Sequence, residues 1–294
     1  MPITPDANRR LIETPQEALQ KAERTAEKDR VLIGDLILRP EPAKRWKEVE
    51  LALSHTQDPK LARKLVTELQ TISPQHTMPV KAGMVHEVLR EYSEHTGAHD
   101  ERLFRLAHES QPYFPGINME QMGYRLLAHD IGKIGIPNSI LEKPGDLTHE
   151  EYETVKSHPL LGRKILRTLD FDKETVRVAE FHHLRQKLDP QGRLTTTGYP
   201  LSSYKKSGLS VLPDEVLLAS MFDVYEAMTS ANRPNVKTYG PFAPSSGRRR
   251  YTPDEALFIM ENGEFGNPVY WTLFPSFKKA VLACEKTNSY EIAA

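Results

Sequence analysis

Cysteine is almost absent from this chain of 294 residues, in which Cys284 is the only one. A lone cysteine forms no internal disulfide and excludes a thiolate cluster, so a metal site would have to use histidine and carboxylate ligands. No apolar run approaches the roughly 20 residues that a membrane span needs, and the first residues, MPITPDANRR, lack the apolar stretch of a signal peptide. We therefore expect a cytoplasmic protein without a membrane segment.

A strong net charge is also missing. The chain has 39 basic and 40 acidic residues and a formal net charge of -1. Because no overall positive field would attract phosphates, a nucleic-acid polymer is disfavoured as a partner. The hydrophobic fraction of 38% and the charged fraction of 27% predict a folded globular protein rather than a disordered one.

Helix-start patterns recur along the chain, whereas alternating strand patterns are hard to find. Thr14, Thr148 and Thr252 each precede a Glu by three residues, which is the spacing of a capping box. Asp58-Pro59 and Pro213-Asp214 indicate two further helix starts. We therefore predict an all-α fold.

Two prolines in the segment 73–79 interrupt the helical pattern and give the best candidate for a domain boundary. We predict an amino-terminal region at 1–77, to which we assign a regulatory role with an unknown signal, and a catalytic domain at 78–294. Residues 239–250, rich in Gly, Pro, Ser and Arg, are typical of a mobile loop.

The chain has eleven histidines, and seven of them lie between His86 and His158. His95 and His99 are four residues apart, so a helix would place both side chains on one face, as helical metal sites require. A single pair of this kind is about as often ordinary surface, so both interpretations stay open for the pair alone.

His129-Asp130 follows the apolar stretch 124–128, which would bring an imidazole and a carboxylate to the buried end of a helix. Gly132 allows that helix to stop, and Lys133 follows it. Because a charge does not enter a core without a partner, this pair is either a metal site or a buried His–Asp hydrogen bond.

Further along, His158 precedes a proline, His182-His183 ends a predicted helix that begins near Asp172, and Asp223 lies in the apolar segment 221–225. Each of these residues alone has a structural explanation. Together with the preceding pairs they supply enough imidazoles and carboxylates for two metal ions that share one carboxylate.

The order of these residues resembles the HD-GYP subgroup of the HD-domain phosphohydrolases over roughly residues 85 to 284. The resemblance rests on the series His99, His129-Asp130, Lys133, His158, His182-His183, Gly198-Tyr199-Pro200 and Asp223. It implies a bundle of helices, a centre of two or three metal ions, and hydrolysis of cyclic di-GMP to pGpG or further to GMP.

The resemblance also implies a ligand set for each of two divalent ions, which we expect to be iron or manganese. The first ion would be bound by His99, His129, Asp130 and Asp223, and the second by Asp130, His158, His182 and His183. Asp130 would then bridge the two ions. Relatives with a third ion use a Glu where this chain has His95, so His95 is the candidate ligand for a third site.

Four further residues receive roles from the resemblance: Lys133 beside the reacting phosphate, and Tyr199, Arg233 and Lys237 as substrate contacts. Lys133 also has a simpler interpretation as a helix cap, and Arg233 and Lys237 as surface residues. The chain departs from the family where Gly198 lies fifteen residues after His183, where Leu184 replaces a Glu, and where Glu226 replaces an Asp.

Three function classes remain open at this point. The first is a cyclic di-GMP phosphodiesterase. The second is a metal hydrolase for another cyclic dinucleotide, such as cyclic GMP-AMP, because the departures lie where a base would be recognised. The third is a catalytically weak module that binds a nucleotide or a protein. The sequence allows a homodimer or a protein partner without indicating either.

Overall fold

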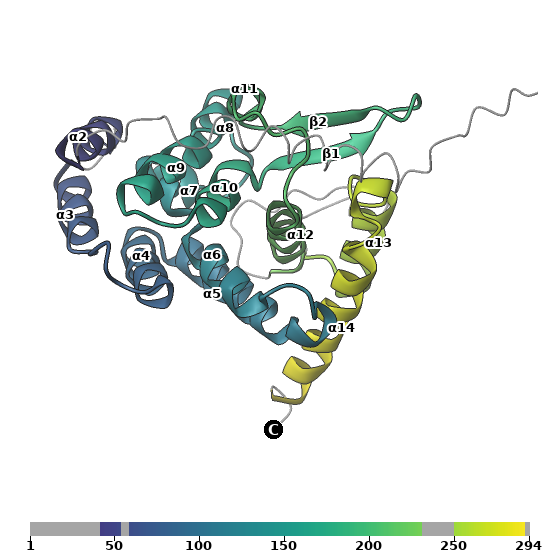
Figure 1. Ribbon diagram of the computed structural model, residues 1–294. Coiled ribbons are helices and arrows are strands. Elements are labelled where there is room, and N and C mark those ends of the chain that lie inside the picture. The colour runs from purple at the N-terminus through teal and green to yellow at the C-terminus, as the bar shows by residue number, and fades with distance from the viewer. Residues whose placement is uncertain (1–41, 54–58, 231–249, 292–294) are drawn as a thin grey trace, which may run out of the picture.

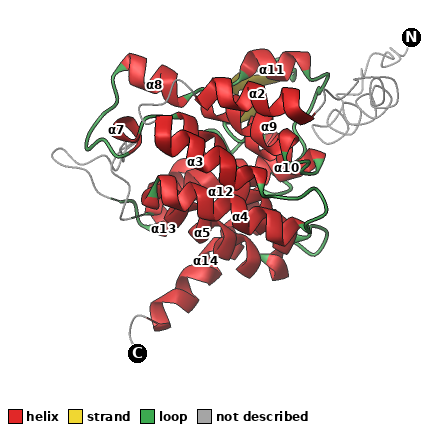
Figure 2. Cartoon of the chain, turned by 90° about the vertical axis from the view of Figure 1, so that its left-hand side faces the viewer, coloured by secondary structure: helices red, strands yellow, loops and turns green. Residues whose placement is uncertain are grey.

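A computed structural model describes residues 42–53, 59–230 and 250–291. Helices make up most of this part of the chain, and the predicted all-α fold is confirmed (Figure 2). The helices of the first half are α2 (Pro42–Leu53), α3 (Pro59–Gln70), α4 (Met78–Tyr92), α5 (Glu94–Glu109), η1 (Gln111–Tyr113), α6 (Met119–Ala128), η2 (Ile131–Gly135) and α7 (Asn138–Leu141).

The second half contains one two-stranded sheet among its helices. Its elements are α8 (His149–Val155), α9 (His158–Thr168), α10 (Lys173–Phe181), β1 (Leu184–Leu188), β2 (Leu194–Gly198), α11 (Leu201–Lys206), α12 (Asp214–Thr229), α13 (Pro253–Asn262), η4 (Pro268–Tyr270) and α14 (Phe274–Glu291). None of the described helices combines the length and the apolar character needed to cross a membrane.

Four of the five predicted helix starts are confirmed. Thr148 and Thr252 each form a complete capping box, in which the hydroxyl accepts from the backbone N–H three residues later and the Glu side chain accepts from the Thr N–H. Helix α3 begins at Pro59, and α12 begins at Asp214. The start predicted at Thr14 lies outside the described residues.

Two apolar clusters hold the helices together. One contains buried side chains of α5, α6, α10, α12, α13 and α14, and the other contains those of α2, α3, α4, η2 and α9. Helices α6 and α10 contribute to both clusters, because Leu126 and Phe181 lie in the first and Ala128 and Ala179 in the second. The carboxyl ends of α6 and α10 therefore lie where the two clusters meet.

The two helices α2 and α3 lie at one edge of the molecule (Figure 1). Val49 and Leu53 of α2 and Leu65 and Leu69 of α3 are buried in the same cluster as Ile165 of α9. This part of the amino-terminal region thus shares its core with the helices that follow. A domain boundary near residue 77 stays a prediction.

The sheet is a hairpin that the sequence did not predict. Strands β1 and β2 pair antiparallel, with Leu184 opposite Gly198, and so return the chain to the point where it left α10. Gly198 has a φ of 97°, and a Cβ there would lie 2.1 Å from the carbonyl oxygen of His183. Only glycine fits this close approach. The fifteen-residue interval after His183 thus contains the hairpin and its turn.

The mobile loop predicted at 239–250 lies outside the described residues, except for Arg250.

Candidate metal centre

Five helices bring the predicted metal ligands together where the two apolar clusters meet. Helix α5 carries His99, the chain beyond α6 carries His129 and Asp130, α9 begins with His158, His182-His183 follow α10, and α12 carries Asp223. Their donor atoms include two compact sets, which we call the His99 group (His99, Asp100, His129 and Asp130) and the His158 group (His158, His182 and His183). Within each group, one donor atom per residue lies within 4.8 Å of all the others.

The backbone fixes the orientation of three of the rings. Each donates its Nδ1–H to the carbonyl oxygen three residues earlier in the chain, at N···O distances of 2.6 to 3.0 Å: His129, His158 and His182. A neutral imidazole that donates from Nδ1 has its lone pair on Nε2. All three lone pairs are therefore available to a ligand in the centre.

The Nε2 atoms of the His158 group face one another. The His158 Nε2 atom is 3.3 Å from that of His182 and 3.2 Å from that of His183. Since His158 and His182 both donate from Nδ1, two lone pairs face each other, and a cation between them would remove their repulsion. Burial, followed by the nearby His129, lowers the pKa of His182 to about 3, so its ring is neutral near pH 7. This donor set fits a metal ion.

Asp130 connects the two groups. Its Oδ1 lies 3.2 Å from His158 Nε2 and 3.7 Å from His182 Nε2, whereas its Oδ2 lies 3.4 Å from His129 Nε2 and 3.9 Å from His99 Nε2. Burial raises its pKa and the neighbouring His129, Lys133 and His158 lower it, and the net result lies well below the ordinary value. The side chain is thus an ionised carboxylate whose two oxygens face different histidine groups.

Asp223 is the second carboxylate that contacts both groups. Its Oδ1 is 3.2 Å from His99 Nε2, and its Oδ2 is 3.9 Å from His183 Nδ1. On the other side of the His99 ring, Nδ1 pairs with Glu226, and Arg102 donates from Nε to the second oxygen of Glu226 at 2.5 Å. Glu226 and Arg102 therefore orient His99 with its Nε2 toward the centre.

Lys133 pairs with Oδ2 of Asp130, and its side chain is only 17% exposed. The turn that carries it packs tightly on α9, because a Cβ on Gly132 would lie 1.9 Å from the carbonyl oxygen of His158. This contact lets the His129-Asp130 segment approach His158. The lysine ammonium therefore reaches the centre from the same turn that brings Asp130 to it.

Tyr199 lies over the His158 group at the end of the hairpin. Its ring centroid is 4.5 Å from that of His183, at an interplanar angle of 32°. Tyr152 of α8 meets the Tyr199 ring edge-on at 6.4 Å, and the Lys156 ammonium lies 5.5 Å from the centroid of Tyr152. Tyr152 is 38% exposed, so an aromatic surface leads from the histidines to solvent.

One predicted site residue that the structure describes lies outside this arrangement. His95 belongs to neither group; its side chain is 47% exposed, and its Nε2 is 3.2 Å from a carboxylate oxygen of Glu142. Its role as a ligand stays a prediction. Arg233 and Lys237 lie outside the described residues.

Sequence reasoning missed Asp100, and it noted Glu226 without giving it a role. A signal for Asp100 was present, because Thr96, Leu103 and Ala107 are buried with it at helical spacing on one face of α5. A carboxylate on an apolar face needs a partner. The partnership of Glu226 with His99 was not readable, since 127 positions separate the two residues.

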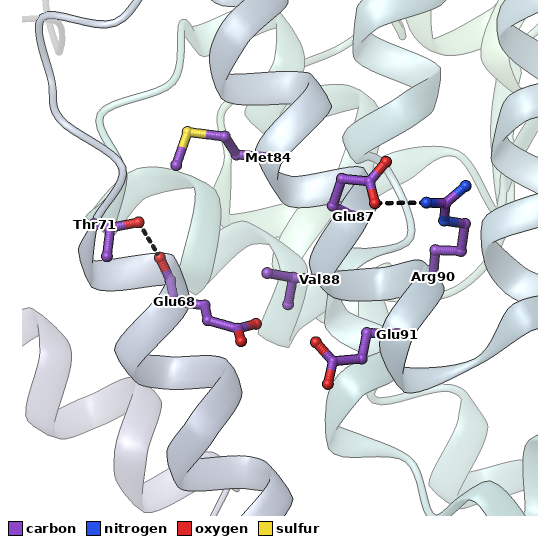
Figure 3. Close-up of a pocket in the computed structure, with 7 residues that line it drawn as sticks. All are labelled: Glu68, Thr71, Met84, Glu87, Val88, Arg90 and Glu91. Carbon is purple, nitrogen blue, oxygen red and sulfur yellow. Dashed lines mark hydrogen bonds and ion pairs between the residues drawn. The ribbon is translucent and has the colours of Figure 1, made fainter.

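A separate pocket of about 500 Å³ lies between α3 and α4 (Figure 3). Glu68, Glu87 and Glu91 line it, and Arg90 pairs with Glu87 at 2.7 Å. None of the predicted site residues lines this pocket. Its carboxylates would repel a phosphate, so it is no alternative site for an anionic substrate.

Comparison with known proteins places this centre in a family. Residues 83–237, which are 155 of the 294, match the family model described as HD domain. This segment contains both histidine groups, Asp223 and the hairpin.

Several curated proteins are similar over part of the chain. A cyclic di-GMP phosphodiesterase of Vibrio cholerae is 36% identical over 110 residues, which are 35% of this chain and 20% of that protein. A 3'3'-cGAMP-specific phosphodiesterase of the same organism is 37% identical over 135 residues, 46% of this chain and 24% of that protein. A cyclic di-GMP phosphodiesterase of Thermotoga maritima is 32% identical over 142 residues, 45% of this chain and 35% of that protein.

The alignments thus cover about a fifth to a third of the length of these relatives. The family match covers more than half of this chain, and within it lie the histidines and carboxylates that converge in the structure. The chain belongs to the HD-domain family.

Proposed function

We propose that this chain is a metal-dependent phosphodiesterase that hydrolyses cyclic di-GMP to linear pGpG or further to GMP. Its metal ligands would be His99, His129, Asp130 and Asp223 for one ion, and Asp130, His158, His182 and His183 for the other. The proposal rests on the geometry of the centre together with the similarity to phosphodiesterases of this family.

The observation that carries the proposal is the position of Asp130. Its two oxygens face different histidine groups, with His158 at 3.2 Å from one and His129 at 3.4 Å from the other. A structural His–Asp hydrogen bond would need one oxygen and one ring. A carboxylate placed between two sets of imidazole lone pairs instead suits two cations that share it.

When bound, two divalent ions lower the pKa of a water molecule and stabilise the charge that develops on phosphoryl oxygens during in-line attack. Lys133 supports this reaction from the protein side. It is held beside Asp130 and partly exposed, so its ammonium can pair with a phosphoryl oxygen or with the departing sugar oxygen.

The aromatic surface beside the centre suits a nucleotide substrate. A base can stack on Tyr152 or Tyr199 while the phosphodiester lies at the histidine groups, because Tyr199 is in contact with His183. Lys156, above the Tyr152 ring, adds a positive charge at the same rim. We retain Arg233 and Lys237 as proposed phosphate contacts on the sequence resemblance alone.

The mixed cyclic dinucleotide 3'3'-cGAMP is the second candidate substrate. It is favoured by the 37% identity with a relative named as specific for that nucleotide. The hairpin β1–β2, which fills the interval that departs from the family pattern, places Tyr199 beside His183 and so shapes the part of the rim that would meet a base.

We further propose iron or manganese as the bound metal. The centre combines imidazole nitrogens, which suit iron, with carboxylate oxygens, which suit manganese, and it has no thiolate. Elemental analysis of the purified protein, set beside its activity with each added metal, tests this identity.

The activity is tested by incubating metal-loaded protein separately with cyclic di-GMP, 3'3'-cGAMP and cyclic di-AMP and separating the products by chromatography. We expect pGpG and then GMP from cyclic di-GMP, with no product after chelation. The controls are Asp130→Asn, which alters the shared carboxylate, and Asp254→Asn, which alters an exposed carboxylate at the start of α13.

Faster turnover of 3'3'-cGAMP would select the second candidate. A protein that holds its metals but cleaves none of the three nucleotides, under reducing or oxidising conditions, would be a binding module rather than an enzyme. Equal loss of activity in Asp130→Asn and Asp254→Asn would remove the support that the centre gives to the proposal.

A further inference from the structure

Asp100 is a buried carboxylate with no hydrogen-bond partner. The side chain is 0% exposed, and neither Oδ1 nor Oδ2 meets a donor. It lies on α5 directly after His99, on the face that also buries Thr96 and Leu103. Burial, followed by the nearby Asp130, raises the pKa of this carboxyl well above its ordinary value, because a carboxylate in this position loses its hydration without compensation.

The nearest groups do not supply the missing partner. His129 Nδ1 is 3.6 Å from Asp100 Oδ1, but that nitrogen already donates to the carbonyl oxygen of Leu126 at 2.7 Å. The ammonium of Lys133 pairs with Asp130 instead.

Three further carboxylates are buried near Asp100, those of Asp130, Asp223 and Glu226. Lys133 pairs with Asp130, and Arg102 pairs with Glu226. Neither of these cationic side chains is a hydrogen-bond partner of Asp100.

The donor geometry indicates which cation would satisfy Asp100. One oxygen of Asp100 lies within 4.8 Å of the donor atoms of His99, His129 and Asp130, and those atoms lie equally close to one another. Four donors so arranged can surround a single ion. The ligand set implied by the sequence resemblance contains His99, His129 and Asp130 but not Asp100.

We propose that Asp100 is an additional metal ligand, which supplies a carboxylate oxygen to the cation bound by His99, His129 and Asp130. The inference rests on the metal centre of the proposed function, but it concerns a residue to which that function gives no role. A third carboxylate on this ion, beside Asp130 and Asp223, favours a metal that accepts oxygen ligands readily, such as Mn²⁺.

Asp100→Asn tests the proposal, because it preserves the shape of the side chain and removes the charge. The matched control is Glu101→Gln, which makes the same change at the next, exposed position of α5. Mn²⁺ binding to metal-free protein is measured by calorimetry, and thermal unfolding is recorded with and without Mn²⁺. None of these readouts requires substrate.

We expect Asp100→Asn to weaken Mn²⁺ binding at one site by more than the 10- to 100-fold that loss of an outer partner produces, with the other site retained. With metal, the variant should also unfold at a lower temperature than wild type, because the bound ion has lost one ligand. Without metal, its unfolding temperature should stay close to that of wild type, because the shape of the side chain is preserved. Glu101→Gln should match wild type in both states.

Unchanged Mn²⁺ affinity in Asp100→Asn, or an equal fall in unfolding temperature with and without metal, would overturn the proposal. If Asp100→Asn does not fold, Asp100→Ser provides the same comparison with a smaller side chain. Wild-type protein that binds no Mn²⁺ or Fe²⁺ would instead contradict the metal centre of the proposed function itself.

Discussion

The buried centre and the aromatic rim beside it are held in place by different kinds of contact. In the centre, backbone carbonyls three residues earlier in the chain, at the ends of α6, α8 and α10, orient His129, His158 and His182. At the rim, Tyr152 and Tyr199 come from α8 and from the end of the hairpin, and their side chains meet edge-on. The centre is therefore fixed by local helical geometry, and the rim by packing between distant segments.

This difference separates two parts of the proposed function. A centre oriented by its own helices keeps its donors in place whatever substrate is bound. A rim built from side-chain contacts can change without disturbing the metals, so base specificity can vary among related chains. The following changes test this separation, beginning with the one for which we expect the largest effect.

Asp130→Ala should abolish metal binding and activity together. The side chain contacts both histidine groups, and its loss also leaves Lys133 without its carboxylate partner. We expect the metal content to fall from about two ions per chain to less than one, and metal-induced stabilisation to disappear. Elemental analysis and thermal unfolding measure both; full metal content with normal turnover would contradict the shared-carboxylate geometry.

Gly132→Ala should damage the centre without altering a ligand. The added Cβ would lie 1.9 Å from the carbonyl oxygen of His158 and 2.5 Å from the backbone nitrogen of Gly162, so η2 and α9 must separate. Overpacking of this kind costs about 1–3 kcal/mol, and metal affinity should fall as well. Gly83→Ala, where a Cβ meets nothing within 4 Å, is the matched control for denaturant unfolding and metal titration.

Lys133→Ala should slow turnover and leave the metals in place. The ammonium contacts Asp130 but supplies no lone pair to a metal. Comparable groups stabilise the transition state by roughly 3 kcal/mol. We expect kcat to fall about a hundredfold at unchanged metal content. Lys143→Ala, which removes a lysine paired with Glu151 at 2.6 Å, should keep the wild-type kcat. An unchanged kcat in Lys133→Ala would make that lysine a helix cap only.

The sequence predicted the helical fold and the residues that converge in the centre because both depend on local patterns. Capping boxes start α8 and α13 where Thr148 and Thr252 predict them. His129 and Asp130 end an apolar helix, so they had to be buried wherever that helix packed. Such signals are contained in a few neighbouring residues.

The remaining features depend on contacts between segments far apart in the chain. The hairpin was missed because its strand β2, LTTTG, is short and lacks an alternating apolar face. The pairing of Glu226 with His99 spans 127 positions. Asp100 was overlooked although its place on the buried face of α5 was predictable from the spacing of Thr96, Leu103 and Ala107.

His95→Ala should have the smallest effect among the predicted ligands. The His95 ring is half exposed and pairs with Glu142 at 3.2 Å, outside both histidine groups. We expect the metal count and kcat to match wild type, and stability to change by less than about 1 kcal/mol, as is usual for an exposed ion pair. A metal count lower by about one would instead make His95 the ligand of a third ion, as the helical spacing of His95 and His99 predicted. Glu142→Gln distinguishes an ion-pair partner from a metal ligand, because it removes the carboxylate partner of His95 and keeps the imidazole. An unchanged metal count in this variant, with a lower count in His95→Ala, would identify His95 as a ligand.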